Sequence, residues 1–133
     1  MRVEGSCHCG AGRFGAEADA GDVSLCHCTD RQRLTGTAFR TSVRALDGTL
    51  RLTRGEPRVL VKAADNGRRR EQHFCGDCGS PLLTREAERQ EGWHLRRGAL
   101  RERGALSPGR AIWLASAVPW LASVPDLPGR DGD

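Results

Sequence analysis

The sequence FCGDCG at residues 74–79 holds two cysteines, Cys75 and Cys78, with one glycine between them and another directly after. Small residues let the backbone fold tightly around a metal ion, so a Cys-x-x-Cys turn of this kind supplies two ligands of a tetrahedral zinc site. The same spacing occurs in redox dithiols, but that motif opens a helix in a β-α-β unit. Pro81 follows shortly after and no β-α-β pattern is visible, so the turn favours metal binding.

A second pair of cysteines must complete such a site, because structural zinc takes four protein ligands. Two Cys-x-Cys pairs compete for this role. Cys7 and Cys9 lie between two glycines that let the backbone aim both sulfurs at one point, whereas Cys26 and Cys28 precede a predicted helix. The spacing alone does not choose between the pairs, and either choice leaves two of the six cysteines over.

The composition indicates one small domain with a thin core. The chain has 133 residues, of which 38% are hydrophobic and only 5% aromatic, and it contains 17 glycines. A chain of this size and composition gains from a metal that ties its parts together, because burial alone leaves little margin of stability.

The N-terminal segment, residues 1–6, contains no apolar run, and no stretch is long enough to span a bilayer. We therefore expect a cytoplasmic protein, in which thiols stay reduced and bind metal or react rather than form disulfides. The net charge of +4 is carried almost wholly by arginine, with the densest cluster at Arg68–Arg70. No aromatic or lysine-rich stripe accompanies this cluster, so the sequence does not favour nucleic-acid binding.

Short apolar-polar segments broken by glycine predict an all-β domain. The predicted strands are 49–53, 58–61, 72–74, 81–84, 93–96 and 111–115. Asp65–Gly67 predicts a hairpin turn, because Asn-Gly accepts positive φ. Trp113 and Trp120 are expected to pack in the core or against a pocket edge.

One short helix is predicted to begin at Thr29, where Gln32 three residues later completes a capping box, and to end at Gly36. Residues 86–90 are expected to form a further helical turn or an exposed loop. We expect residues 1–124 to form the domain and residues 125–133, rich in proline, glycine and aspartate, to form a frayed tail.

Three ordered cysteine motifs resemble those of the glutathione-dependent formaldehyde-activating enzyme family, which includes the homologous domain of centromere protein V. The motifs are GSCHCGA at residues 5–11, CHC followed by a small polar residue at 26–29, and FCGDCGSPL at 74–82. The later segments Arg97–Leu100, Ile112-Trp113 and Pro119-Trp120 also resemble the family's closing region, so the resemblance covers nearly the whole chain.

The resemblance implies a β-tent, which is built of small antiparallel sheets, and it implies which cysteines pair. In the family, the first Cys-x-Cys joins the Cys-x-x-Cys around a structural zinc. That set corresponds here to four residues: Cys7, Cys9, Cys75 and Cys78. The middle motif of the family holds a second, catalytic zinc, which corresponds here to Cys26 and Cys28 only.

The sequence departs from the family at three positions. Arg31 stands where the family has the third cysteine of the middle motif, and arginine does not ligate zinc. Ala111 and Ala117 stand where the family often has a histidine and a lysine. Each change removes a group that binds metal or holds an anion.

Three interpretations of the pair Cys26 and Cys28 remain open. The pair binds zinc with a substitute third ligand such as His27, Asp30 or water; or it is metal-free, with a reactive thiolate or a disulfide; or it is a remnant in which Arg31 replaces the metal as a structural cation. The start of the predicted helix would favour a thiolate at either cysteine.

The functional hypothesis that follows from the resemblance is a carbon–sulfur lyase that acts on a small thiol adduct. Its ligand would be a thiol-containing or anionic molecule similar to glutathione, whose carboxylates arginines would bind. The alternative is a non-catalytic, zinc-stabilised binding module. We expect one tightly held zinc ion per chain.

Overall fold

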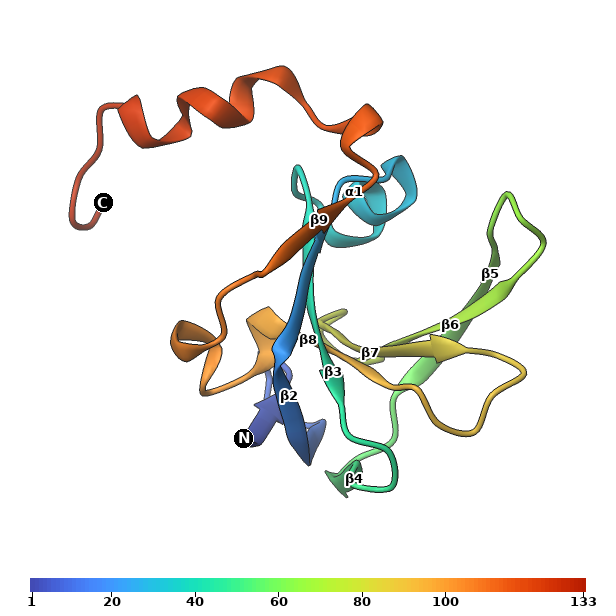
Figure 1. Cartoon of the computed structure of the whole chain (residues 1–133). Helices are drawn as coiled ribbons and strands as arrows, with labels where there is room; N and C mark the ends of the chain where they lie inside the picture. Colours follow the sequence, from blue (N-terminus) through green and yellow to red (C-terminus); the bar gives the residue numbers. More distant parts are fainter.

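The computed structural model describes residues 1–133, and β-strands dominate it (Figure 1). The strands are β1 (Arg2–Ser6), β2 (Arg13–Cys26), β3 (Arg40–Ala45), β4 (Arg51–Arg54), β5 (Arg58–Ala63), β6 (Arg69–Phe74), β7 (Pro81–Glu86), β8 (His94–Arg96) and β9 (Arg110–Ile112). The helices are α1 (Thr29–Thr35) and the 3-10 helices η1 (Arg97–Ala99), η2 (Arg103–Ala105), η3 (Leu114–Ser116) and η4 (Pro119–Asp126).

The strands follow the order β1-β2-β3-β8-β7-β6-β5, and β4 and β9 pair with the long strand β2. Every pairing is antiparallel except that of β2 with β9. The register of β2 against β3 shifts between Ala18 and Val23, which lets the first half of β2 pair with β1 and β4 and the second half with β3 and β9. The expectation of an all-β fold built of antiparallel sheets is confirmed.

One face of the central strands forms the apolar core. Val43 of β3 and Leu83 of β7 both pair with Leu95 of β8, and all three side chains are fully buried. Side chains alternate along a strand, so the neighbouring residues point to the opposite face. That face is polar, since Ser42 lies opposite Arg96 and Gln72 lies opposite Thr84, and all four residues are buried.

Most of the predicted strands are present, and the turn at Asn66-Gly67 has the predicted positive φ at glycine, 81°. The predicted strand 111–115 is wrong in its second half. The strand β9 ends at Ile112, because Trp113 adopts a left-handed conformation with φ of 57° and the 3-10 helix η3 follows. Of the two alternatives predicted for residues 86–90, the exposed loop is present: Glu86 ends β7, and a turn and an exposed loop follow.

The helix α1 confirms the predicted end at Gly36, which has φ of 71°. The predicted capping box is wrong. The N-cap residue is Cys28, and no side chain caps the helix. Gln32 instead donates from Nε2 to the carbonyl oxygens of His27 at 2.7 Å and Ser116 at 3.1 Å. The side chain therefore links the helix to the segment that follows β9.

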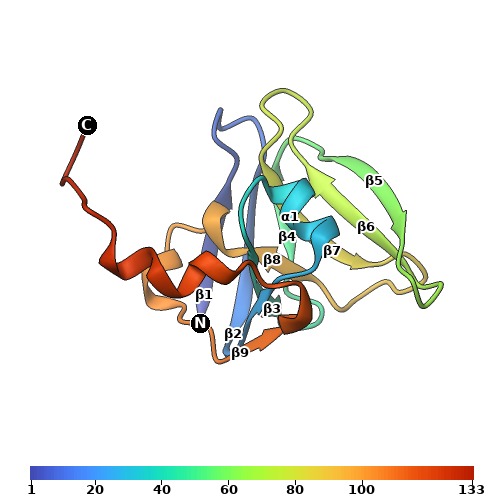
Figure 2. The same ribbon diagram turned by 90° about the horizontal axis from the view of Figure 1, so that it is seen from above.

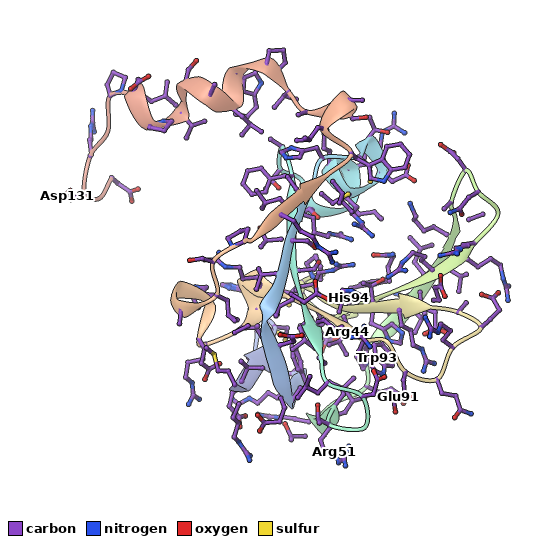
Figure 3. All side chains as sticks on the ribbon, viewed as in Figure 1. Arg44, Arg51, Glu91, Trp93, His94 and Asp131 are labelled. Carbon is purple, nitrogen blue, oxygen red and sulfur yellow. The ribbon has the colours of Figure 1, made fainter.

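The C-terminal segment extends away from the strands, as Figure 2 shows from above. Trp113 and Trp120 are 57% and 58% exposed, so the expectation that they pack in the core is wrong. Trp93, labelled in Figure 3, is the best packed of the three tryptophans. The Arg85 guanidinium lies 4.4 Å from the centre of its ring, and the His73 ring packs edge-on with 5.0 Å between the ring centres. His94 begins β8, as predicted for a strand residue. No helix is both long and apolar enough to cross a bilayer.

Candidate metal centre and arginine-lined cavity

Four cysteines from two turns meet at one point. Cys7 and Cys9 lie in the turn after β1, and Cys75 and Cys78 lie in the turn after β6; their four sulfur atoms all lie within 4.8 Å of one another. The Cys7–Cys9 and Cys9–Cys75 sulfur distances are 3.6 Å and 3.8 Å. Four sulfurs bound to zinc at about 2.3 Å would stand about 3.8 Å apart, so this donor set fits a tetrahedral ion.

Hydrogen bonds within the protein shape both cysteine turns without the help of a metal ion. In the first turn, Cys7 donates its N–H to the carbonyl of Gly12 at 3.0 Å, and Gly12 donates its N–H to the Cys7 sulfur at 3.2 Å. In the second turn, Cys75 donates to the carbonyl of Ser80 at 2.9 Å. The Ser80 hydroxyl accepts the His8 N–H at 3.0 Å and thereby joins the two turns.

The four cysteine thiols have too little positive charge around them for all four to become thiolates together. The Ser80 hydroxyl and nearby N–H groups lower the pKa of Cys78 to about 5. The N–H of Ala11 lowers the pKa of Cys9, but the sulfurs of Cys7, Cys78 and Cys75 together with burial outweigh this effect, and the pKa of Cys9 rises to about 12. A bound cation would supply the missing charge, which is why these residues could hold a metal ion.

The remaining cysteines lie elsewhere. Cys26 ends β2 and is buried, and Cys28 caps α1. The structure has one cluster of three or more metal-ligating groups, and it does not include these two cysteines. Of the substitute ligands considered, Asp30 forms an ion pair with Lys62 of β5. The ring of His27 is buried against Phe39, with no hydrogen-bond partner for Nδ1.

The expectation of a thiolate at the start of α1 does not hold for Cys28. Burial raises the pKa of Cys28, and the Cys26 thiol raises it further, although the backbone N–H of Arg31 and its guanidinium lower it. Since α1 spans only seven residues, its dipole is a weak counterweight to burial.

Two buried arginines lie beside this pair, on the polar face of the strands. Arg40 is paired with Cys26 across β2 and β3, and Arg96 lies two residues along on the neighbouring strand β8. The side-chain oxygen Oε1 of Gln72 accepts from Arg40 Nη1 at 2.8 Å and from Arg96 Nη2 at 2.9 Å. The other acceptors are the hydroxyls of Thr35 and Ser42. All of these acceptors are neutral.

Neither buried guanidinium has an acidic partner, since none of the chain's ion pairs includes Arg40 or Arg96. Burial and the nearby Arg31 cation lower the pKa of Arg40 to about 10. Burial, with the Arg40 cation beside it, lowers the pKa of Arg96 well below its usual range. Burial and Arg31 also lower the pKa of Arg70.

Sequence reasoning missed this arginine pair. The available signal was alternation: in RTSVRA at 40–45, the residues Arg40 and Ser42 fall on the face opposite Thr41 and Val43. This alternation identifies the shared face only once residues 40–45 are known to form a strand.

A cavity of about 1000 Å³ lies between the four-cysteine turns and the arginine pair. Cys7, His8 and Ser80 line one side of it, and Arg40 and Arg96 line another. Its lining contains one carboxylate, Glu4, and six arginines: Arg13, Arg40, Arg96, Arg97, Arg101 and Arg103. Neither Cys26 nor Cys28 is in the lining. The cavity is therefore suited to an anionic molecule.

Comparison with known proteins agrees with this fold. The family model for the glutathione-dependent formaldehyde-activating enzyme matches residues 2–116. No curated protein matches the chain. A crystal structure of a Rhodobacter sphaeroides protein is similar with a TM-score of 0.61 and 20% sequence identity, covering 81% of this chain and 98% of that one. At that identity the similarity shows the fold alone.

Proposed function

The chain belongs to the glutathione-dependent formaldehyde-activating enzyme family, and from this we propose that it acts as a carbon–sulfur lyase on a small thiol adduct. The family match over residues 2–116 carries the proposal, and the basic cavity beside the four-cysteine cluster supports it. A reducing, cytoplasmic location is part of the proposal, because it keeps the six free cysteines as thiols.

The metal in this proposal is zinc, held by the sulfurs of Cys7, Cys9, Cys75 and Cys78. When bound, the ion stabilises four thiolates and contributes to the free energy of folding. Its role is structural, because four protein ligands leave no open coordination position for a substrate.

The reaction proposed is the cleavage or formation of an S-hydroxymethyl thiol. In cleavage, the carbon–sulfur bond breaks, the hydroxyl proton moves to the sulfur, and the products are the free thiol and formaldehyde. Arginine side chains of the cavity would hold the carboxylates of a glutathione-like substrate, since guanidinium binds carboxylate through two parallel hydrogen bonds.

We further propose that the second metal site of the family is depleted in this chain. Arg31 replaces the third cysteine, and Cys26 and Cys28 belong to no cluster of metal-ligating groups. Two cysteines without a third ligand do not fit a catalytic zinc, which usually has three protein ligands. This observation favours a second candidate function, a non-catalytic binding module with the same structural zinc.

Metal content and activity test these proposals together. Elemental analysis of the purified chain after dialysis against a chelator should give about one zinc per chain. Turnover of labelled formaldehyde with glutathione, followed by NMR, should exceed the uncatalysed exchange. One zinc without turnover would favour the binding module, and two zinc ions would contradict a depleted site.

Arg31→Cys restores the missing ligand and sharpens this test. The variant should hold about two zinc ions per chain, because a third thiolate completes the set with Cys26 and Cys28. Arg33→Cys is the matched control, since Arg33 is exposed on the same helix, and it should still hold one. Unchanged zinc content in Arg31→Cys would contradict the assignment of this position as the lost ligand.

A further inference from the structure

We propose that the cavity binds a small oxyanion, such as a carboxylate, on the buried guanidinium pair of Arg40 and Arg96. The inference deepens the proposed function, on which the choice of glutathione as one probe rests. It concerns a binding site on the strands β3 and β8 and is independent of the metal centre.

The buried guanidiniums of Arg40 and Arg96 carry positive charge that no acidic side chain balances. Arg40 and Arg96 are 3% and 5% exposed, and buried charges are normally paired with an opposite charge. Here the guanidiniums donate only to Gln72, Thr35 and Ser42, which are neutral. Neutral acceptors satisfy hydrogen bonds but leave two positive charges in the interior.

Nearby carboxylates do not supply the missing charge. Glu71 accepts hydrogen bonds from His73 and Arg85, and Glu86 pairs with Arg68. Glu4, the only carboxylate that lines the cavity, lies near Arg2 at 3.7 Å. The pair therefore lacks a carboxylate partner within the chain, and the nearest groups that could carry negative charge are the thiols of Cys26 and Cys28.

Two further arginines add to the excess of positive charge. Arg70, on β6, has a buried Nε without a hydrogen-bond partner. Burial lowers the pKa of Arg40, Arg70 and Arg96, and the Arg31 cation lowers it further in all three. This excess of positive charge would attract an anion to the buried pair.

The geometry also offers a seat for the anion. Oε1 of Gln72 accepts from both guanidiniums at once, so a single acceptor oxygen can bridge Arg40 and Arg96, and an anion would take this position by displacing the Gln72 amide. Both arginines line the cavity of about 1000 Å³, which gives a small molecule room to reach them. A carboxylate or a sulfate presents oxygen acceptors that match paired guanidiniums.

Titration calorimetry on the full chain tests the site with two probes at constant ionic strength. Sulfate carries no thiol, so it reports on the guanidinium site whether or not the chain is an enzyme. Glutathione and its dimethyl ester differ in their carboxylates. We expect sulfate and glutathione to bind, and the ester to bind at least about tenfold more weakly than glutathione.

Gln72→Glu is the decisive variant, because it places a carboxylate between the two guanidiniums. The variant should raise Tm and weaken sulfate binding by at least about tenfold, since the new carboxylate takes the place of the ligand. Gln90→Glu adds the same charge at an exposed position and should leave Kd for sulfate unchanged within about twofold.

Arg70→Gln is a second test variant, because it leaves the hydrogen bonds of Arg40 and Arg96 intact. It removes one nearby positive charge and should therefore also weaken sulfate binding. Sulfate binding without glutathione binding would support the oxyanion site while counting against the proposed substrate. If neither probe binds, or if sulfate binds equally to the wild type and Gln72→Glu, the proposal is overturned.

Discussion

At the scale of single residues, Gly5, the first residue of the first cysteine motif, must lack a side chain for the core to pack. A Cβ placed on Gly5 would meet the ring of Phe14 at 2.1 Å, and Phe14 is fully buried opposite it on β2. The ring covers the backbone of β1 just before the turn that carries Cys7. A side chain at position 5 therefore disturbs both the core and the approach to the metal centre.

Gly5→Ala should lower the free energy of unfolding by about 1–3 kcal/mol, because the added methyl group overpacks a filled core. Gly15→Ala is the matched control on the neighbouring strand, since a Cβ there would meet its nearest neighbour at an ordinary 3.7 Å. Denaturant unfolding of both variants measures the difference. Equal stability of the two variants would contradict the proposed packing role of Gly5.

The residues of the metal centre were the most predictable part of the molecule. Cys75 and Cys78 stand in a turn whose glycines and spacing indicate metal binding from the sequence alone. The choice of Cys7 and Cys9 as partners came from family resemblance, because spacing does not say which distant turns meet. The structure brings these four sulfurs together. Arg40 and Arg96 escaped prediction, since burial of an arginine depends on tertiary packing.

At the scale of elements, the long strand β2 could not be predicted from the sequence. The segment 13–26, which forms β2, contains alanine, glycine and aspartate where strong strand formers would be expected. Its pairing with four other strands decides its conformation instead of its intrinsic propensity. The predicted strands β5 and β7 contain runs of apolar residues, VLV at 59–61 and LL at 82–83, which favour a strand. Tertiary pairing therefore overrides propensity in the first third of the chain.

One side chain links α1 both to the residues just before it and to a distant segment of the chain. Gln32 reaches the carbonyls of His27 and Ser116, and the latter is 84 residues away in sequence. Gln32→Ala should lower the free energy of unfolding by about 1–2 kcal/mol, because two carbonyl acceptors lose their donor. Amide hydrogen exchange in η3 should also become faster.

Arg33→Ala on the same helix serves as the control, because Arg33 is exposed and makes no ion pair. It should change the free energy of unfolding by less than about 0.5 kcal/mol. Unaltered exchange in η3 of Gln32→Ala would show that other contacts hold the C-terminal segment against α1.

At the scale of the whole molecule, the four-cysteine centre joins the turn after β1 to the turn after β6. In the strand order β1 is the first strand and β6 is the last but one, with β2, β3, β8 and β7 between them. A metal ion bound at the four cysteines would resist separation of these distant strands. The boundary of the domain at residue 124 stays a prediction.

Cys9→Ser should remove the metal and lower Tm, because a ligand is lost from the proposed zinc set. A site bound at free zinc about 1,000 times its dissociation constant contributes about 4 kcal/mol. Cys26→Ser should retain one zinc per chain and show a smaller change in Tm. Elemental analysis and thermal unfolding of both variants measure these outcomes. Loss of zinc from Cys26→Ser alone would assign the tightly bound metal to the other pair.

The sequence distance between the two turns also bears on synthesis of the chain. Cys9 and Cys75 are 66 residues apart, so a growing polypeptide presents only two of the four sulfurs until its second turn leaves the ribosome. A metal ion could therefore bind all four sulfurs only after Cys78 has been made. Until then the amino-terminal strands are without this cross-link and have only their own backbone pairing.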